Sequence, residues 1–225
     1  MTPRGRPFRD RRDAGQRLAR ELLRFKDEKP IVLALPRGGV PVGYEVARAL
    51  AAPLDVLLVR KIGAPGYEEL GLGAIVEGAT PLTVLNEEVM AAVQPPADYL
   101  EAERQRQVAE MERRRRLYRG ERAFPQVRDR VVILIDDGIA TGGTARAALL
   151  ALRQAGAKRL ILAVPVAPAD VLARLGPLAD DIVCLETPEP FHAVGEHYEI
   201  FAQTDDEEVV ALLASARAGG GATPA

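Results

Sequence analysis

The segment VVILIDDGIATGGT, residues 131–144, decides the fold of this 225-residue chain. Its first five residues, Val131–Ile135, are apolar and mostly β-branched, which predicts a central strand covered on both faces. Two acids follow, and the glycines and threonines of TGGT then open a run with helical spacing. A strand, a polar loop and a helix in this order indicate a parallel α/β unit.

The loop after this strand combines an anion site with a pair of carboxylates. Main-chain N–H groups at the start of a helix have no partner within the helix and carry positive partial charge, so Thr141–Thr144 suit a phosphate. Asp136 and Asp137 would repel phosphate, and their natural partners are hydroxyl groups or a metal ion. A sugar phosphate would suit both, because its phosphate fits the anion site and its hydroxyl groups can donate to the carboxylates. The spacing fits neither a Walker loop nor the dinucleotide fingerprint.

The segment resembles the phosphoribosyl-pyrophosphate (PRPP) motif of type I phosphoribosyltransferases. That motif has four apolar residues, two acids, a short apolar spacer and Thr-Gly-Gly/Lys-Thr, and ILIDDGIATGGT departs from it at Gly138, where we expect looser packing. The resemblance implies that Asp136 and Asp137 hold the ribose hydroxyls and, directly or through water, Mg²⁺. It implies a cradle for the 5′-phosphate made by Ala140, Thr141, Gly142, Gly143 and Thr144.

A second strand–loop–helix unit lies near the N-terminus. The apolar run Ile31–Leu35 ends in Pro-Arg-Gly-Gly, and Val40–Ala51 then has helical spacing. Gly38 and Gly39 let the main chain approach a ligand, and Arg37 offers a fork of donors to phosphate. By resemblance this loop binds pyrophosphate. A simple Pro-Gly turn is the alternative.

A third predicted strand, Leu54–Val59, ends in two adjacent cations, Arg60 and Lys61. They are either solvated at an exposed strand end or bound to an anion, and by resemblance they lie near the pyrophosphate. The glycine-rich stretch Gly63–Gly73 is expected to be a mobile loop that closes over the site.

The alternation of strands and helices predicts an α/β fold with a doubly wound, mainly parallel sheet. By resemblance the strand order is 3-2-1-4-5-6, with the strands at residues 31 and 131 adjacent and an antiparallel strand at the edge. A hairpin of Ala74–Glu77 and Leu82–Leu85 would supply that edge strand. We expect a single domain over residues 1–217 and a flexible tail over residues 218–225.

Two segments lie outside the expected core, an insertion at about residues 87–129 and a small hood at about residues 186–201. The insertion contains a long charged helix, Asp98–Tyr118, with a basic cluster at Arg113–Arg116. It is a solvated helix packed by one face, a contact in a homodimer or a nucleic-acid patch, and the sequence leaves these alternatives open.

The composition limits the class of protein. Hydrophobic residues make up 48% of the chain and the formal net charge is −2, which argues against nucleic-acid binding. No apolar run is long enough to cross a membrane and the N-terminus has no secretory signal, so we expect a cytoplasmic protein without membrane partners. The single cysteine, Cys184, is expected in the core.

The resemblance implies transfer of a 5-phosphoribosyl group between PRPP and a nitrogenous acceptor, with Mg²⁺ as cofactor and pyrophosphate as leaving group. We expect Asp136, Asp137, Arg37 and Lys61 to form the catalytic set, and PRPP or a nucleoside 5′-monophosphate and a small acceptor to be the ligands. Ala140 stands where 6-oxopurine enzymes of the family have an aspartate, so the acceptor stays open. The alternative is a non-catalytic regulator that senses PRPP and binds nucleic acid.

Overall fold

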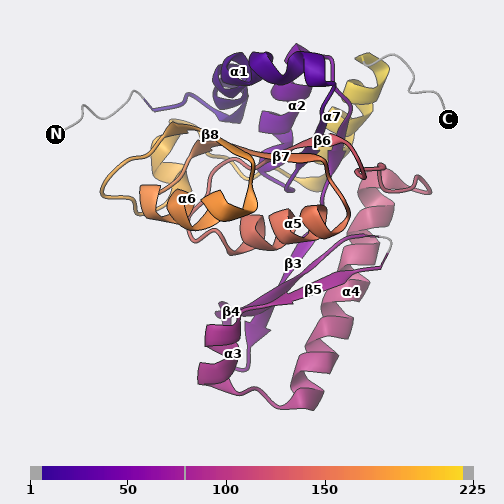
Figure 1. Ribbon diagram of the computed structural model, residues 1–225, viewed down its shortest axis with the longest axis vertical. Coiled ribbons are helices and arrows are strands. Elements are labelled where there is room, and N and C mark those ends of the chain that lie inside the picture. The colour runs from indigo at the N-terminus through magenta and orange to yellow at the C-terminus, as the bar shows by residue number, and fades with distance from the viewer. Residues whose placement is uncertain (1–6, 79, 220–225) are drawn as a thin grey trace.

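The computed structural model describes residues 7–78 and 80–219 and is built on a five-stranded parallel sheet. The strand order is β2-β1-β6-β7-β8. The chain passes from β1 to β2 on one side and from β6 to β7 on the other, so the order reverses between β1 and β6 (Figure 1). The predicted adjacency of these two strands and the doubly wound α/β class are confirmed. The strands are β1 (Ile31–Ala34), β2 (Leu54–Val56), β6 (Val131–Ile135), β7 (Arg159–Val166) and β8 (Asp181–Glu186).

Helices cover both faces of this sheet (Figure 1). One layer contains α1 (Arg11–Leu22), α2 (Gly39–Leu50) and α7 (Asp206–Gly219), and the other contains α5 (Gly143–Gln154) and α6 (Ala169–Leu175). Successive side chains of β6 alternate between the two layers: Ile133 packs in the core on the α2 side and Leu134 in the core on the α5 side. This double burial explains why the strand has no polar face. Short 3₁₀ turns complete the body at η1 (Leu23–Glu28), η2 (Gly176–Leu178) and η3 (Val194–His197).

The chain ends follow their capping signals. Asp10 accepts a hydrogen bond from the main-chain N–H of Asp13 (2.8 Å) and begins α1, which buries Ala14, Leu18 and Leu22 on one face. Asp205 caps α7 in the same way through the N–H of Glu208 (2.7 Å). Residues 218 and 219 of the predicted tail belong to α7, and residues 220–225 lie outside the described residues.

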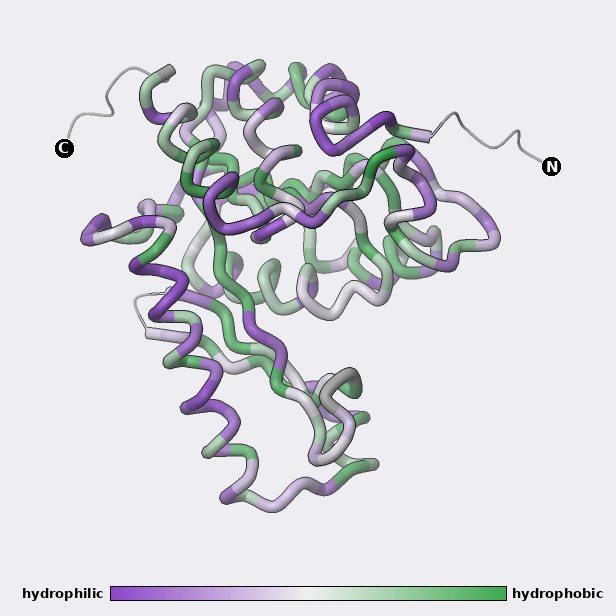
Figure 2. The backbone as a smooth tube through the Cα atoms, turned by 180° about the vertical axis from the view of Figure 1, so that it is seen from behind, coloured by the Kyte–Doolittle hydropathy of each residue, from purple (hydrophilic) through white to green (hydrophobic). Residues whose placement is uncertain are grey.

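A smaller antiparallel sheet, with two helices, forms an arm that projects from this body (Figure 1). The arm, residues 59–119, contains β3 (Val59–Ala64), β4 (Tyr67–Val76), β5 (Leu82–Leu85), α3 (Glu87–Val93) and α4 (Ala97–Arg119). Pairing of Val76 with Leu82 confirms the predicted hairpin. Figure 2 shows α4 as a largely hydrophilic helix beside the more hydrophobic strands of the arm.

The arm corrects three details of the sequence-based fold. The antiparallel strands form their own sheet and do not extend the edge of the parallel one. Arg60 and Lys61 lie within β3 and not at the end of a strand, because β2 stops at Val56. Residues 63–73, predicted to be a mobile loop, belong mostly to the paired strands β3 and β4, joined by a turn at residues 65–66.

The edge of the parallel sheet is closed by hydrogen bonds to side chains. The N–H of Val56 donates to Asp55 Oδ1 (2.7 Å), and the carbonyl of Val56 accepts from Arg119 Nη2 (2.9 Å). Both outward main-chain groups of Val56 are therefore engaged and cannot pair with another strand. This explains why the chain turns away after β2 and begins a second sheet.

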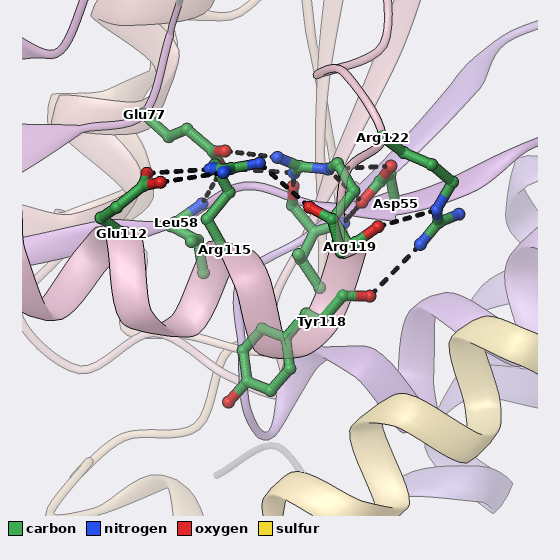
Figure 3. Close-up of polar contacts among 10 residues, drawn as sticks. Asp55, Leu58, Glu77, Glu112, Arg115, Tyr118, Arg119 and Arg122 are labelled. Carbon is green, nitrogen blue, oxygen red and sulfur yellow. Dashed lines mark hydrogen bonds and ion pairs between the residues drawn. The ribbon is translucent and has the colours of Figure 1, made fainter.

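Arg119 also forms the joint between the arm and the body (Figure 3). Its guanidinium is fully buried at the end of α4, where it pairs with Glu77 after β4 and with Asp55 of β2 (3.2 Å). Burial alone would lower the pKa of Arg119, but the two carboxylates outweigh it and the pKa is raised. Within residues 7–78 and 80–219, no helix has the length and apolar character needed to cross a membrane.

Candidate functional site

The candidate site lies where β1 and β6 end side by side. The N–H of Leu35 donates to the carbonyl of Ile135 (2.8 Å), so the loops that follow the two strands start in contact. Open α/β sheets bind ligands outside the carboxyl ends of their strands, at the point where the strand order reverses. The sequence predicted this juxtaposition, and the sheet order supplies it.

Two glycines let these loops approach closely. A Cβ at Gly39 would lie 2.9 Å from the carbonyl oxygen of Ile135, and a Cβ at Gly38 would lie 2.0 Å from Asp137 Oδ2. Either methyl group would collide with the loop after β6. The two glycines of this candidate ligand loop are therefore also required for packing.

Asp136 opens into a cavity of about 550 Å³ beside these loops. Thr144, at the start of α5, and Pro36 line the same cavity. Burial and then the negative charge of Asp137 raise the pKa of Asp136 well above its ordinary value. An ionised Asp136 is thus costly in the free protein, and hydroxyl donors or a cation would offset that cost.

The Asp137 side chain has its partners outside the cavity. Its carboxylate accepts from Arg11 Nε (2.7 Å) on α1, and its main-chain carbonyl accepts from the Tyr198 hydroxyl (2.5 Å). Arg11 also donates to the carbonyl of Ala202 (2.6 Å) and stacks over Phe201. The two acids, expected to act side by side, are close to each other but have different partners, and Asp137 does not line the cavity.

The loop before α5 has the features of an anion cradle. Ala140 and Thr141 are exposed, and the first hydrogen bond of the helix runs from the N–H of Arg146 to the carbonyl of Gly142 (2.8 Å). The N–H groups of Gly143 and Thr144 therefore precede the helical ladder. Gly142 has φ of +83°, and a Cβ there would lie 2.8 Å from Val171 Cγ1. Glycine is thus required to form the turn.

The prediction of loose packing at Gly138 is wrong. A Cβ at this position would lie 2.4 Å from Val194 Cγ1 and 3.0 Å from Val166 Cγ1. The space that a larger residue would fill is taken by Val194 from the tail. The predicted hood segment, residues 186–201, thus packs against the loop of the acids and against Phe8, whose N–H donates to the carbonyl of His197 (2.9 Å).

The predicted cations divide between two places. Arg60 and Lys61 line the cavity from β3, whereas the Arg37 guanidinium lies 3.8 Å from Asp206 at the start of α7 and does not line it. Burial, and then the positive charge of Arg114, lower the pKa of Arg60. Of the carboxylates that the structure describes, none forms an ion pair with Arg60.

Sequence reasoning missed the contribution of the inserted helix α4, which lines one side of the cavity. Its Tyr99 hydroxyl donates to the carbonyl of Gly63 (3.0 Å), and its Gln107 accepts from Arg60 Nε (2.9 Å). The sequence does contain a pattern that could have indicated this: polar side chains recur at helical spacing on one face of the helix. They are Tyr99, Glu103, Arg106 and Gln107.

A metal ion would find few protein ligands here. The described residues contain no group of three or more His, Cys, Asp or Glu side chains placed to hold a metal. Asp136 is the one carboxylate of the predicted pair that faces the cavity. This fits Mg²⁺ only in the way common at phosphate sites, with one carboxylate from the protein and the other ligands from water and substrate oxygens.

Comparisons with known proteins agree with this architecture. The phosphoribosyl transferase domain model matches residues 10–200. Two Mycobacterium tuberculosis proteins, Rv0571c and MT0597, are named provisionally as phosphoribosyl transferases and are 47% identical over 206 residues. The match covers 92% of this chain and 46% of each of theirs, so the chain spans about half the length of these curated relatives.

Two solved structures extend the comparison. The protein TT1426 from Thermus thermophilus is 44% identical, with a TM-score of 0.79 over 93% of this chain and 98% of that one. AQ2163 from Aquifex aeolicus is 14% identical, with a TM-score of 0.50 over 82% and 78% of the two chains, and shares the fold alone.

Proposed function

Because the chain belongs to the phosphoribosyl transferase family, we propose that it transfers a 5-phosphoribosyl group between PRPP and a nitrogenous acceptor, with release of pyrophosphate. One observation carries the proposal: a carboxylate, a helix N-terminus and two cations, Asp136, Thr144, Arg60 and Lys61, line one cavity at the switch point of the sheet. These are the groups that a phosphorylated sugar with a charged leaving group requires.

The body of the protein would hold the ribose 5-phosphate half. The 5′-phosphate would lie on the main-chain N–H groups of Ala140–Thr144, and Asp136 would accept hydrogen bonds from ribose hydroxyls. The negative charge of Asp136 would also stabilise the positive charge that develops on the ring as the bond to pyrophosphate breaks. Asp137 would contribute less directly, since Arg11 already neutralises it.

The leaving group gathers negative charge as the anomeric bond lengthens. Arg60 and Lys61, with the main-chain N–H groups of Arg37 and Gly38, would stabilise that charge. Arg37 would join them by exchanging its loose contact with Asp206. Mg²⁺ bound by Asp136 and the diphosphate oxygens would neutralise further charge.

The experiment that tests this function supplies PRPP and Mg²⁺ with a panel of nucleobases and small amides or amines and measures released pyrophosphate. We expect acceptor-dependent release, and calorimetric binding of PRPP with Mg²⁺ that is lost in the Asp136→Asn/Asp137→Asn double variant. Absence of PRPP binding by the wild-type protein, or equal binding by the folded double variant, would overturn the proposal.

The competing regulator hypothesis gains no support from the arm. The arginines at 113–116 pair along α4 with two glutamates, Glu110 and Glu112, at distances of 2.8–3.3 Å. A nucleic-acid surface needs positive charge that is free to meet phosphates. The enzyme hypothesis is therefore the one that the charges favour.

A further inference from the structure

We infer that the inserted helix α4 forms one wall of the pyrophosphate subsite, and that Glu103 and Gln107 are positioning residues that aim Arg60 at the diphosphate. The inference rests on the proposed function and deepens it, because it assigns the two ends of PRPP to different parts of the molecule. The body would hold the ribose 5-phosphate end, and the arm would hold the pyrophosphate end.

The first argument is the face that α4 presents to the cavity. Tyr99, Glu103, Arg106 and Gln107 follow one another at intervals of four, three and one, which places them on one side of the helix. All four line the cavity together with Asp136 and Thr144. The cavity is therefore closed on this side by the insertion.

The second argument is a directed chain of hydrogen bonds. Gln107 Nε2 donates to Glu103 Oε1 (2.7 Å), and Gln107 Oε1 accepts from Arg60 Nε (2.9 Å). An amide can serve both partners in only one orientation, because a carboxylate only accepts and a guanidinium only donates. Glu103 is only 6% exposed, so the carboxylate at which this series of hydrogen bonds begins is held in place. Arg60 is held by Nε, and its terminal nitrogens make no hydrogen bond to any described residue.

The third argument is the balance of charge across the cavity. The arm contributes three cations, Arg60, Lys61 and Arg106, against the single carboxylate of Glu103. The opposite wall contributes the carboxylate of Asp136. The more highly charged end of an anionic ligand is therefore attracted to the arm, and in PRPP that end is the pyrophosphate. Arg37, which faces Asp206, does not alter this balance.

The test separates the two ends of the ligand by measuring calorimetric affinities for inorganic pyrophosphate and for ribose 5-phosphate, each with Mg²⁺. Gln107→Leu removes the hydrogen bonds to both Glu103 and Arg60, and Gln107→Glu places a carboxylate against Arg60. We expect either variant to weaken pyrophosphate about tenfold and to leave ribose 5-phosphate within about twofold. Arg60→Ala should reproduce the pyrophosphate loss.

The chain contains a matched control on the outer face of the same helix. Gln105 donates to Glu101 Oε1 (2.8 Å), with the same residue types and spacing as the pair in the cavity, but it does not line the cavity. Gln105→Leu should leave both affinities unchanged. Unchanged pyrophosphate affinity in both folded Gln107 variants, or an equal loss for both ligands, would overturn the inference. Failure of the wild-type protein to bind either ligand would instead overturn the proposed function.

Discussion

The body and the arm contribute to one cavity but are stabilised in different ways. The body is held by apolar strands buried on both faces, and β6 has no polar side chain along its length. The arm has apolar contacts under its sheet, but its long helix α4 is strongly charged and buries few side chains. The groups that would hold the sugar phosphate therefore lie on the apolar body, whereas the cations for the leaving group lie on a projection that joins the body through apolar contacts and one buried set of ion pairs.

The largest effect is expected at the joint, where Arg119 pairs with Glu77 and Asp55. Arg119→Met should lower the free energy of unfolding by about 3–5 kcal/mol, because it leaves Glu77 and Asp55 partly buried without their cation. Urea unfolding measures the loss. Arg116, which pairs with exposed Glu112 on the same helix, is the control, and Arg116→Met should change stability little. A loss below about 1 kcal/mol in the Arg119 variant would contradict the importance of the joint.

The body half of the site is tested by Asp136→Asn. Removal of the carboxylate that faces the cavity should weaken PRPP binding or turnover about a hundredfold. The melting temperature should stay equal or rise, since burial and Asp137 both disfavour the ionised form of Asp136. Calorimetry with PRPP and Mg²⁺ measures the loss of binding, and a thermal melt measures the change in melting temperature. A folded variant with wild-type affinity would be incompatible with Asp136 as a ribose ligand.

The sequence predicted the body well because its signals are local. The apolar run at residues 131–135, the acids after it and the TGGT turn each determine structure within a few residues. The adjacency of β1 and β6 came from the resemblance to the family and not from a local signal, and the pairing of the two strands confirms it.

What the sequence could not predict depends on contacts between distant segments. Arg11 pairs with Asp137 across 126 positions, and this pair decides which acid faces the cavity. Val194 fills the space left by Gly138 across 56 positions. Likewise, Arg119 closes the edge at Val56, so the predicted edge strand becomes part of the arm. None of these partners is marked by a local pattern, because each requires the tertiary fold to bring it into place.

A matched pair of glycines compares packing in the two regions. Gly138→Ala in the body should cost about 1–3 kcal/mol, since the new methyl group would overlap Val194. Gly71→Ala in β4 of the arm meets no atom within 4 Å and should be neutral or stabilising by about 0.4–1 kcal/mol. Urea unfolding of both variants is the measurement. The second substitution Val194→Ala should recover part of the loss in the body, and equal costs at the two glycines would refute the contrast.

The smallest expected effect is the acid sensitivity of the arm. Side-chain hydrogen bonds from Arg113 and Arg115 lower the pKa values of Glu110 and Glu112, respectively, from 4.5 to about 2. Between these values the unfolded chain binds more protons, so this contribution is complete above about pH 4.5 and is lost as the pH falls through about 2. Because the pairs are largely exposed, each contributes little and salt screens it.

Hydrogen exchange, corrected for the intrinsic effect of pH, can detect this loss in α4. Between pH 6 and pH 3 the amides of α4 should lose more protection than those of β6, and Glu112→Gln should reduce the difference. High salt at pH 6 should reproduce part of the loss in α4, because it screens the same pairs without protonating them. Equal changes in α4 and β6 would mean that the arm and the body unfold as one unit, which would remove the distinction between the apolar body and the charged projection.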